Sequence, residues 1–519
     1  MKKVSKLLAV VMAFSIMVAL NVAVFATTTK TDGTKANVVN GGETAKINVL
    51  TGNENDVLNA YKVVETIYDK DTNTINRNFT ATFEQFTAAN TEYKTMTVDD
   101  YVKLNETKLK EVLGKFAFYV RTNNVNPEYV STNISNEEKA EFEAVAMGQY
   151  IIVGSGNTNG AYIYQTVTAE VEPFVENDEY KIYEQYSVKM KVSKPTVEKN
   201  IINGTATDGN RQTASVGDVI TYKLSAAVPV YPKGATDTTL YLGDELSEGL
   251  TLDLSSIVVK GENGENSKTL TSGNQYTIKE EGQKFYVDLN YGKIKTYTTV
   301  TVEYKATLNE KAKVGTAVGN ENIVEYVYKN SPFDGTTYNS EDSDRPTPDT
   351  PGFGDDDDKE IVYTFGVAIE KIDKDNNAVK LKNAKFKLYD NKECTGNAIK
   401  EVTTNESGIA SFEGLKAGKY YLVETMAPTG YKKLLEPIEI VVNAASGIYT
   451  ITADKTEITT DVEKENGYKK VTVENKKGAT LPTAGGMGTA LFVAGGLIIM
   501  LGAATGVYVI RRKTVKERW

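Results

Sequence analysis

The chain has 519 residues, enough for about three or four domains, and its net charge of −10 argues against a nucleic-acid-binding protein, which needs a basic surface. Histidine is absent, which removes the usual general base near neutral pH and the commonest metal ligand. The composition therefore argues against hydrolases and metalloenzymes, and we expect no cofactor and no metal site. A single cysteine, Cys394, excludes an intramolecular disulfide. The 31 tyrosines, with many threonines and valines, indicate abundant β-structure.

The N-terminus has the three parts of a secretory signal peptide. Lys2, Lys3 and Lys6 precede an apolar stretch over residues 7–25, and Ala26 supplies the small residue of a cleavage site. We therefore assign residues 1–26 to a signal peptide and expect an exported, secreted chain. Residues 27–43 are rich in threonine, lysine, asparagine and glycine, and are predicted to be a flexible lead-in.

Residues 44–192 are predicted to form an α+β domain. Alternating apolar and polar residues over 45–50 indicate a strand. Apolar residues at helical spacing predict a helix over 98–118. The segment 136–147 suggests a second helix, because its early glutamates suit the first turn. Further strands are expected at 149–153, 162–171 and 186–192.

Residues 193–341 are predicted to form a β-sandwich, because nearly every segment is strand-like and turns recur between them. The stretch 342–360 that follows contains three prolines and the acidic run 355–358. Since a run of like charges is usually solvated, we expect 342–360 to be a linker. Strands of the sandwich are expected at 196–201, 218–224, 238–242, 285–289, 297–308 and 323–328.

A third β-rich domain is expected over residues 361–475. Behind it, residues 476–485 contain a short spacer and the pentapeptide Leu481-Pro482-Thr483-Ala484-Gly485. Residues 486–510 carry no charge, and roughly 20 apolar residues suffice to span a bilayer, so this stretch is a predicted transmembrane segment. The basic tail 511–519 should stay in the cytoplasm by the positive-inside rule. The bulk of the chain is then expected outside the cell.

The pentapeptide, apolar span and basic tail together resemble the cell-wall sorting signal of Gram-positive surface proteins. In that family a sortase cleaves between the fourth and fifth residues, which implies attack on the carbonyl of Ala484 and attachment to the cell wall. The family pattern is Leu-Pro-x-Thr-Gly, so Thr483 takes the variable position and Ala484 replaces the usual threonine. A plain membrane anchor is the alternative.

The third domain contains two specific stretches. Residues 367–373 read VAIEKID, and residues 420–431 read YYLVETMAPTGY. Together they resemble the B-type Ig-like repeat of collagen-binding surface proteins, and the second stretch matches the pilin E-box at every fixed position. The resemblance implies an isopeptide bond between Lys371 and Asn475 with Glu424 as catalyst. The alternative is that Lys371 is an exposed strand residue and Glu424 pairs with another lysine.

The second domain presents a similar order of residues. Lys199 lies on its opening strand, Asp244 follows in its middle, and Asn322 precedes its closing strand. This order resembles the isopeptide-forming middle domain of fimbrial backbone subunits, which implies a Lys199–Asn322 bond with Asp244 as catalyst. Asn320 is an alternative partner, and an ordinary sandwich without the bond is the alternative structure. In both domains burial would assist the chemistry, because it lowers the pKa of a lysine and raises that of a carboxyl group.

Polymerisation by sortase needs an acceptor amine, which the pilin family supplies from a lysine in a Val-Tyr-Pro-Lys motif. Residues 230–233 have this sequence, so Lys233 is the predicted acceptor, with Lys191 as the alternative. Family members carry that lysine at the junction of the first two domains, whereas Lys233 follows early strands of the second domain.

These features together resemble the backbone subunit of a sortase-assembled pilus, mainly β, with tandem Ig-like sandwiches behind an α+β domain. The implied partners are sortase, peptidoglycan and other copies of the chain. A monomeric wall-anchored adhesin or minor pilin that binds a host or cell-surface ligand is the alternative. The resemblance implies self-crosslinking but no enzyme activity.

Overall fold

The structure is a computed structural model, and its chain divides into two compact units. The first comprises residues 1–205, 216–312 and 318–362, and the second comprises 206–215, 313–317 and 363–519. The residues that the structure describes are 29–30, 34–51, 57–133, 139–154, 162–208, 211–232, 235–315, 319–332, 338, 345–443, 450–453, 456–458, 461–463, 468–478 and 487–516.

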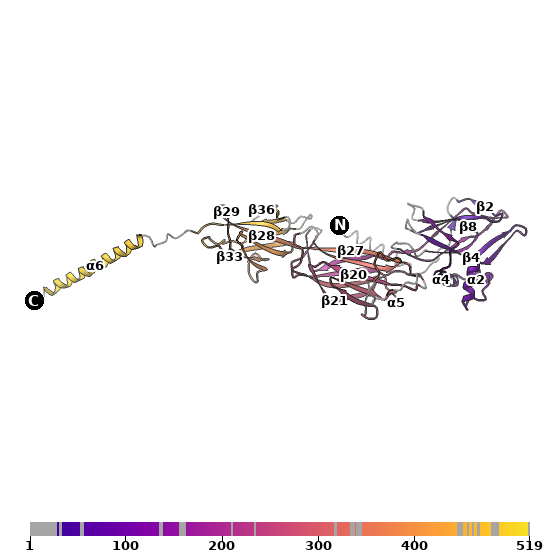
Figure 1. Ribbon diagram of the computed structural model, residues 1–519, viewed down its shortest axis with the longest axis horizontal. Helices are drawn as coiled ribbons and strands as arrows, with labels where there is room; N and C mark the ends of the chain where they lie inside the picture. Colours follow the sequence, from indigo (N-terminus) through magenta and orange to yellow (C-terminus); the bar gives the residue numbers. More distant parts are fainter. Residues whose placement is uncertain are drawn as a thin grey trace. The chain divides into compact units, whose positions relative to one another are not determined.

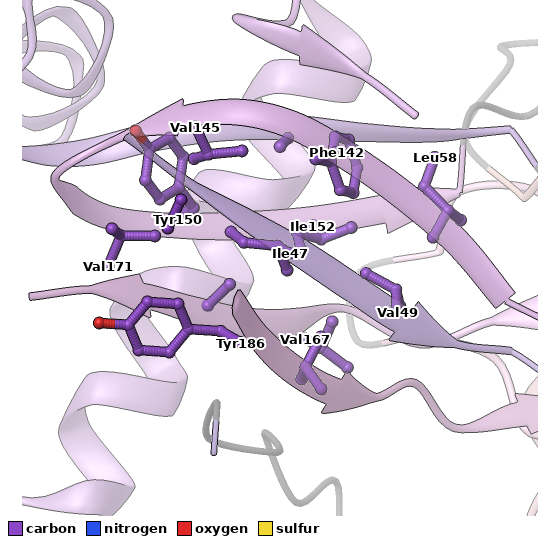
Figure 2. Packing of buried hydrophobic residues seen from close by; sticks show 14 of the residues in the cluster. Ile47, Val49, Leu58, Phe142, Val145, Tyr150, Ile152, Val167, Val171 and Tyr186 are labelled. Carbon is purple, nitrogen blue, oxygen red and sulfur yellow. The ribbon is translucent and has the colours of Figure 1, made fainter. Parts of the chain in front are cut away.

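The first unit begins with two sheets whose apolar faces pack together. Figure 2 shows Ile47 and Phe142 from one sheet among Tyr150, Ile152 and Val167 from the other. One sheet has the order β1 (Thr29–Lys30), β14 (Gln185–Lys189), β3 (Thr44–Leu50), β8 (Lys139–Ala146) and β7 (Thr132–Asn133). The other has the order β11 (Val167–Val171), β9 (Gly148–Gly154), β4 (Leu58–Asp69) and β5 (Thr74–Phe79), with β6 (Tyr129–Val130) beside β4. Short pairings link β12 (Phe174–Glu176), β13 (Glu179–Tyr183) and β2 (Ala36–Val38), and β10 (Ile163–Tyr164) with β15 (Val192–Ser193).

Helices cover the outer face of the second of these sheets. The helices are α2 (Ala81–Ala89), α3 (Val98–Tyr101) and α4 (Glu106–Thr122), and Figure 1 shows α2 and α4 beside β4. Strand β9 is apolar on both faces because Tyr150 and Ile152 pack between the sheets while Ile151 and Val153 face the helices. The helix predicted over 98–118 is divided in two, because Thr97 forms a capping box with Asp100 and Asn105 then caps α4.

The helix predicted over 136–147 is wrong, since Lys139–Ala146 forms strand β8. Its pairing with β3 places Ala140 opposite Val49 and Phe142 opposite Ile47, and all four side chains are buried. This packing outweighs the helix propensity of the alanines and glutamates, which is high in rank but contributes less than about 1 kcal/mol per residue.

The rest of the first unit is the predicted β-sandwich. One sheet has the order β16 (Val197–Asn203), β19 (Val219–Ala227), β25 (Thr299–Leu308), β21 (Leu250–Asn263) and β22 (Asn266–Thr269). The facing sheet runs through β27 (Phe353–Tyr363), β26 (Asn320–Lys329), β20 (Leu240–Leu246), β24 (Lys284–Leu289) and β23 (Tyr276–Glu281), and the short helix α5 (Tyr291–Ile294) follows β24. Alternate residues of β19, β24 and β25 are buried, as expected for strands with one face in a core.

The acidic run is a strand rather than a solvated linker. Strand β27 pairs antiparallel with β26 along Asn320–Lys329. Two of its four aspartates accept hydrogen bonds from the backbone of β16: the amide of Val197 donates to Asp356 Oδ2 (2.8 Å), and that of Lys199 donates to Asp358 Oδ2 (2.7 Å). The predicted linker was wrong at this end because hydrogen bonds to an edge strand offset the repulsion between neighbouring charges.

The second unit contains the third predicted domain, another two-sheet sandwich. One sheet has the order β29 (Asn376–Lys380), β28 (Phe365–Asp373), β38 (Tyr468–Asn475) and β37 (Asp461–Glu463), with β32 (Ile409–Leu415) also on β28. The other has the order β31 (Lys400–Thr403), β30 (Lys385–Tyr389), β33 (Gly418–Met426), β34 (Ile438–Asn443), β35 (Thr450–Ala453) and β36 (Thr456–Ile458). The hairpin β17 (Ala206–Asp208) and β18 (Arg211–Thr213) is grouped with this unit. The core of this third-domain sandwich includes Phe365, Phe386, Phe412 and Val473.

Helix α6 (Met487–Lys516) ends the described chain. Its segment Ala494–Arg511 has a mean hydropathy of 1.6 and is long and apolar enough to cross a membrane, which fits the predicted transmembrane segment 486–510. The signal peptide and the sorting pentapeptide lie outside the described residues. The architecture confirms the predicted mainly-β class.

Candidate functional site

The sandwich of the first unit buries a cluster of polar side chains between its sheets. Lys199 comes from β16 and Tyr304 from β25 of one sheet, whereas Asp244 from β20 and Asn322 from β26 belong to the facing sheet. The side chains of Lys199 and Asp244 are 0% exposed. Asn322 and Tyr304 are also buried. Isolated charges are unstable in such a place, so every member must find a partner.

All four side chains contact one another. Lys199 Nζ donates to Asp244 Oδ2, to Asn322 Oδ1 (2.8 Å) and to Tyr304 OH (3.0 Å). Tyr304 OH donates to Asp244 Oδ1 (2.9 Å) and accepts from Asn322 Nδ2 (2.7 Å). The predicted Lys199, Asp244 and Asn322 are therefore brought together. The alternative partner, Asn320, donates instead to Val362 O (3.2 Å).

Burial pushes both ionisable partners toward their neutral forms. It lowers the pKa of Lys199, against the opposing attraction of Asp244. It also raises the pKa of Asp244, against the opposing effects of Lys199 and Tyr304. An uncharged lysine amine is a nucleophile and a protonated carboxyl group is an acid, so the cluster holds a nucleophile, an acid and a carboxamide in contact.

The third domain buries a second cluster of the same kind. Strands β28 and β38 are parallel neighbours, with Lys371 opposite Val473 and Asp373 opposite Asn475. This register brings Lys371 Nζ within 2.5 Å of Asn475 Oδ1 and within 3.6 Å of Glu424 Oε1 on β33. The side chains of Lys371 and Glu424 are 0% exposed, so the alternative of an exposed Lys371 is wrong.

Glu424 is held by two further hydrogen bonds. Asn475 Nδ2 donates to its Oε1 (2.8 Å), and the amide of Leu434 donates to its Oε2 (2.7 Å). Burial lowers the pKa of Lys371 to about 8, although Glu424 acts in the opposite direction. A fraction of this amine is therefore neutral near physiological pH.

Two supporting residues were missed by the sequence analysis. Tyr304 lies in no motif, and its burial suggests only a core residue. Asp358 was assigned to the acidic linker, yet its carboxylate accepts from the backbone amide of Lys199 and fixes that strand. Strand alternation, which places Tyr304 on the same face as Val302 and Ala306, is the one signal that could have pointed it inward.

The predicted acceptor Lys233 lies outside the described residues, but the preceding residues are described. Gln165 Nε2 donates to Val230 O (2.8 Å), and the amide of Val230 contacts Ser193 Oγ (3.4 Å). The segment that leads to Lys233 therefore touches the first domain and the junction at Ser193. The acceptor role of Lys233 stays a prediction. The carbonyl of the alternative Lys191 accepts from the amide of Gln165 (3.0 Å).

Comparison with known protein families assigns three parts of the chain. Residues 216–332 match the Gram-positive pilin backbone subunit 2, Cna-B-like domain, and residues 365–457 match the prealbumin-like fold domain called SpaA. Residues 473–516 match the LPXTG cell wall anchor motif. The fold and the anchor define a cell-wall-anchored surface protein built from pilin domains.

The chain is also similar to individual streptococcal proteins. The chain is 29% identical over 482 residues to the trypsin-resistant surface T6 protein of Streptococcus pyogenes, covering 79% of this chain and 88% of that protein. The T6 backbone pilin structure from serotype M6 Streptococcus pyogenes has a TM-score of 0.62 at 24% identity, covering 84% of this chain and 98% of that one. The group B streptococcus pilus 2b backbone protein gives a TM-score of 0.40 at 27% identity, over 55% of this chain and 99% of that one. The chain thus contains segments that match pilin domains and a cell wall anchor motif, and it is similar to a streptococcal backbone pilin.

Proposed function

We propose that the chain is the backbone subunit of a covalent pilus, reinforced by two isopeptide bonds that it forms unaided. The observation that carries this proposal is the recurrence of one arrangement in consecutive sandwiches: a buried lysine in contact with both an asparagine carboxamide and a carboxyl group. Burying a lysine beside a carboxylate does not by itself stabilise a domain, because the cost of desolvating the two charges can exceed the gain from their mutual attraction. Two such burials in consecutive domains therefore favour a chemical role for the lysines.

The proposed bond formation consumes no cofactor. The neutral Nζ of Lys371 attacks Cγ of Asn475, the Nζ–Cγ bond forms, and the Cγ–Nδ2 bond breaks. One hydrogen leaves Nζ, Nδ2 gains one, and ammonia departs. Glu424 contacts Nδ2 directly and lies 3.6 Å from Nζ, so it supports both proton movements. In the first unit Lys199 and Asn322 react alike, with Asp244 as the catalytic carboxyl group.

For polymerisation, a sortase forms an acyl intermediate at Ala484 and releases the segment from Gly485 onward. The amine of Lys233 on another copy then completes an amide between subunits, with Lys191 as the alternative acceptor. Peptidoglycan takes the place of that amine when the finished chain is attached to the wall. A host or cell-surface ligand belongs to the second candidate, a monomeric adhesin.

Intact mass spectrometry tests the internal bonds. The mature ectodomain, residues 27–484, should be lighter than its sequence by the mass of two ammonias. Asp244→Ala and Glu424→Ala should each lose one of these deficits. Glu245→Ala is the matched control, because Glu245 follows Asp244 on β20 but its side chain is 54% exposed. An unmodified wild-type mass would contradict the crosslinking proposal.

Co-expression with sortase tests polymerisation separately. A covalent ladder should appear for wild type and disappear for Lys233→Arg, whose guanidinium is not a usable nucleophile. Loss of the ladder in Lys191→Arg instead would assign the alternative acceptor. A monomeric product from wild type would favour the adhesin.

A further inference from the structure

The two buried clusters differ in how the carboxyl group reaches the leaving amide nitrogen. In the third domain Glu424 Oε1 accepts directly from Asn475 Nδ2 at 2.8 Å. In the first unit Asn322 Nδ2 is not bonded to Asp244 but to Tyr304 OH at 2.7 Å, and that hydroxyl in turn bonds Asp244 Oδ1 at 2.9 Å. Aspartate is one methylene shorter than glutamate, and the tyrosine hydroxyl occupies the resulting gap.

We propose that Tyr304 is a catalytic residue of the Lys199–Asn322 crosslink, carrying a proton from Asp244 to the departing nitrogen of Asn322. This inference rests on the proposed isopeptide bond in that domain. The hydroxyl contacts the nucleophile at 3.0 Å as well as the leaving group, so it touches the reacting atoms on both sides.

The proton balance of the step closes without any external reagent. In the structure the Tyr304 hydroxyl hydrogen points at Asp244 Oδ1. In the neutral pair Asp244 carries its own proton on Oδ1, so this hydroxyl hydrogen turns toward Nδ2, whose lone pair becomes available as Cγ turns tetrahedral. As Nζ of Lys199 bonds to Cγ of Asn322, Oδ1 gives its proton to the tyrosine oxygen and the tyrosine passes its own hydrogen to Nδ2. Nζ of Lys199 gives one of its own hydrogens to Oδ2 of Asp244, which replaces the proton that left Oδ1. The Cγ–Nδ2 bond then breaks and ammonia leaves, with Tyr304 and Asp244 both restored.

The surroundings of Tyr304 suit a relay rather than an ionised phenolate. Its ring is stacked on Tyr222 with centroids 5.4 Å apart, and Phe285 packs edge-on at 5.0 Å. These contacts fix the ring and therefore the position of the hydroxyl. Burial holds the pKa of Tyr304 well above its ordinary value, so the group keeps one hydrogen while it accepts and donates. A hydroxyl can donate once and accept twice, and all three positions are used here.

The test uses the mature ectodomain made by cell-free synthesis, sampled at intervals and digested, so that each branched peptide is quantified over time. Tyr304→Phe keeps the ring and removes the hydroxyl. We expect its Lys199–Asn322 peptide to form at least about 10-fold more slowly, since general acid–base catalysis typically contributes about 100-fold or more. The Lys371–Asn475 peptide of the same molecule should form at the wild-type rate.

Tyr326→Phe is the matched control. Tyr326 is also buried in this sandwich, and its hydroxyl donates to Ala227 O at 2.9 Å without touching the cluster. We expect its crosslinking rates to match wild type. A rate for Tyr304→Phe within twofold of wild type would overturn the relay while leaving the isopeptide bond intact. Absence of the Lys199–Asn322 peptide from wild type would instead refute the bond itself.

A folding defect is separated from a catalytic one in the Lys199→Met background, where no bond can form in this domain. There, both variants should stay folded, and Tyr304→Phe should lower the melting temperature more than Tyr326→Phe, because it leaves Asp244 Oδ1 and Asn322 Nδ2 without a partner. If only the Tyr304→Phe combination is unfolded, the slow crosslinking has a structural cause and the catalytic assignment fails.

Discussion

Replacing Lys371 with methionine should reveal how much the proposed bond in the third domain stabilises it. Methionine has a similar length, and its sulfur makes favourable contacts with aromatic rings such as that of Phe386, whose centroid lies 6.0 Å from Lys371 Nζ. The substitution therefore removes the crosslink without leaving an unpaired buried charge on β28. The substitution removes the proposed covalent tie between the first and last strands and the contact of Nζ with Glu424, which keeps its hydrogen bonds from Asn475 and Leu434.

The magnitude follows from the length of the closed loop. Lys371 and Asn475 are 104 residues apart. The chain-entropy treatment of crosslinks gives about 4.7 kcal/mol at 25 °C for a loop of about 100 residues. A domain of this size shifts its melting temperature by roughly 4 °C or more per kcal/mol, so the transition of the third domain should fall by about 20 °C.

Differential scanning calorimetry of the mature ectodomain measures this, because it resolves transitions of separate domains. Lys382→Met is the control, since Lys382 pairs with Glu406 in the same domain but its side chain is 53% exposed. We expect its transition to move by only about 1 kcal/mol, or a few degrees. A shift for Lys371→Met no larger than that of the control would refute the covalent tie.

Three further predictions concern pH and supporting residues. Burial lowers the pKa of Lys371 to about 8 in the intact cluster, below the ordinary 10.5, and the pKa should stay lowered in Asn475→Ala, where no bond can form. The unfolded chain then binds more protons than the folded one between these two values, so the free energy of unfolding should rise with pH from about 8 to 10.5 in denaturant titrations. Lys371→Met in the same background should flatten the rise. Asp358→Ala leaves the amide of Lys199 without its acceptor and should cost about 1–3 kcal/mol by calorimetry, whereas the exposed neighbour Asp357 should tolerate alanine; equal effects would contradict the role of Asp358. Thr97→Ala removes the capping box of α3 and should destabilise the first domain by about 1 kcal/mol, while alanine at the exposed Asp99 should not.

The sequence predicted the fold class, and its motifs named the lysine, the asparagine and the carboxyl group of each cluster, because these depend on short-range patterns. The E-box and the VAIEKID segment name Lys371 and Glu424 directly, and strand alternation turns both side chains inward. The structure adds the parallel register of β28 and β38, which is what places Asn475 beside them. The roles of these residues stay predictions, supported by their burial and contacts.

What the sequence could not supply depends on long-range pairing. Segment 139–146 has helix-forming residues, yet its partner β3 lies about 90 or more positions away in the chain, as the 95-residue separation of Lys46 and Glu141 shows. Asp356 and Asp358 look solvated until the backbone amides of β16 are placed next to them. Tyr304 is one tyrosine among 31, and only the arrangement of four strands shows which buried hydroxyl meets Asp244.

The end of β38 determines which part of the third domain would carry load in a fibre. After Asn475, backbone hydrogen bonds join the start of the spacer to the loop at the end of the E-box. The amide of Lys432 donates to Lys476 O (2.9 Å), and the amide of Gly478 donates to Gly430 O (2.8 Å). Once Lys371 and Asn475 are joined, a pull on Ala484 passes through the spacer and across the new amide into β28. The chain between Lys371 and Asn475 then carries no tension, because the amide between their side chains bypasses it. Its turns can lengthen or change without altering the tensile strength of the fibre, whereas every residue from Lys476 to Ala484 bears the whole pull.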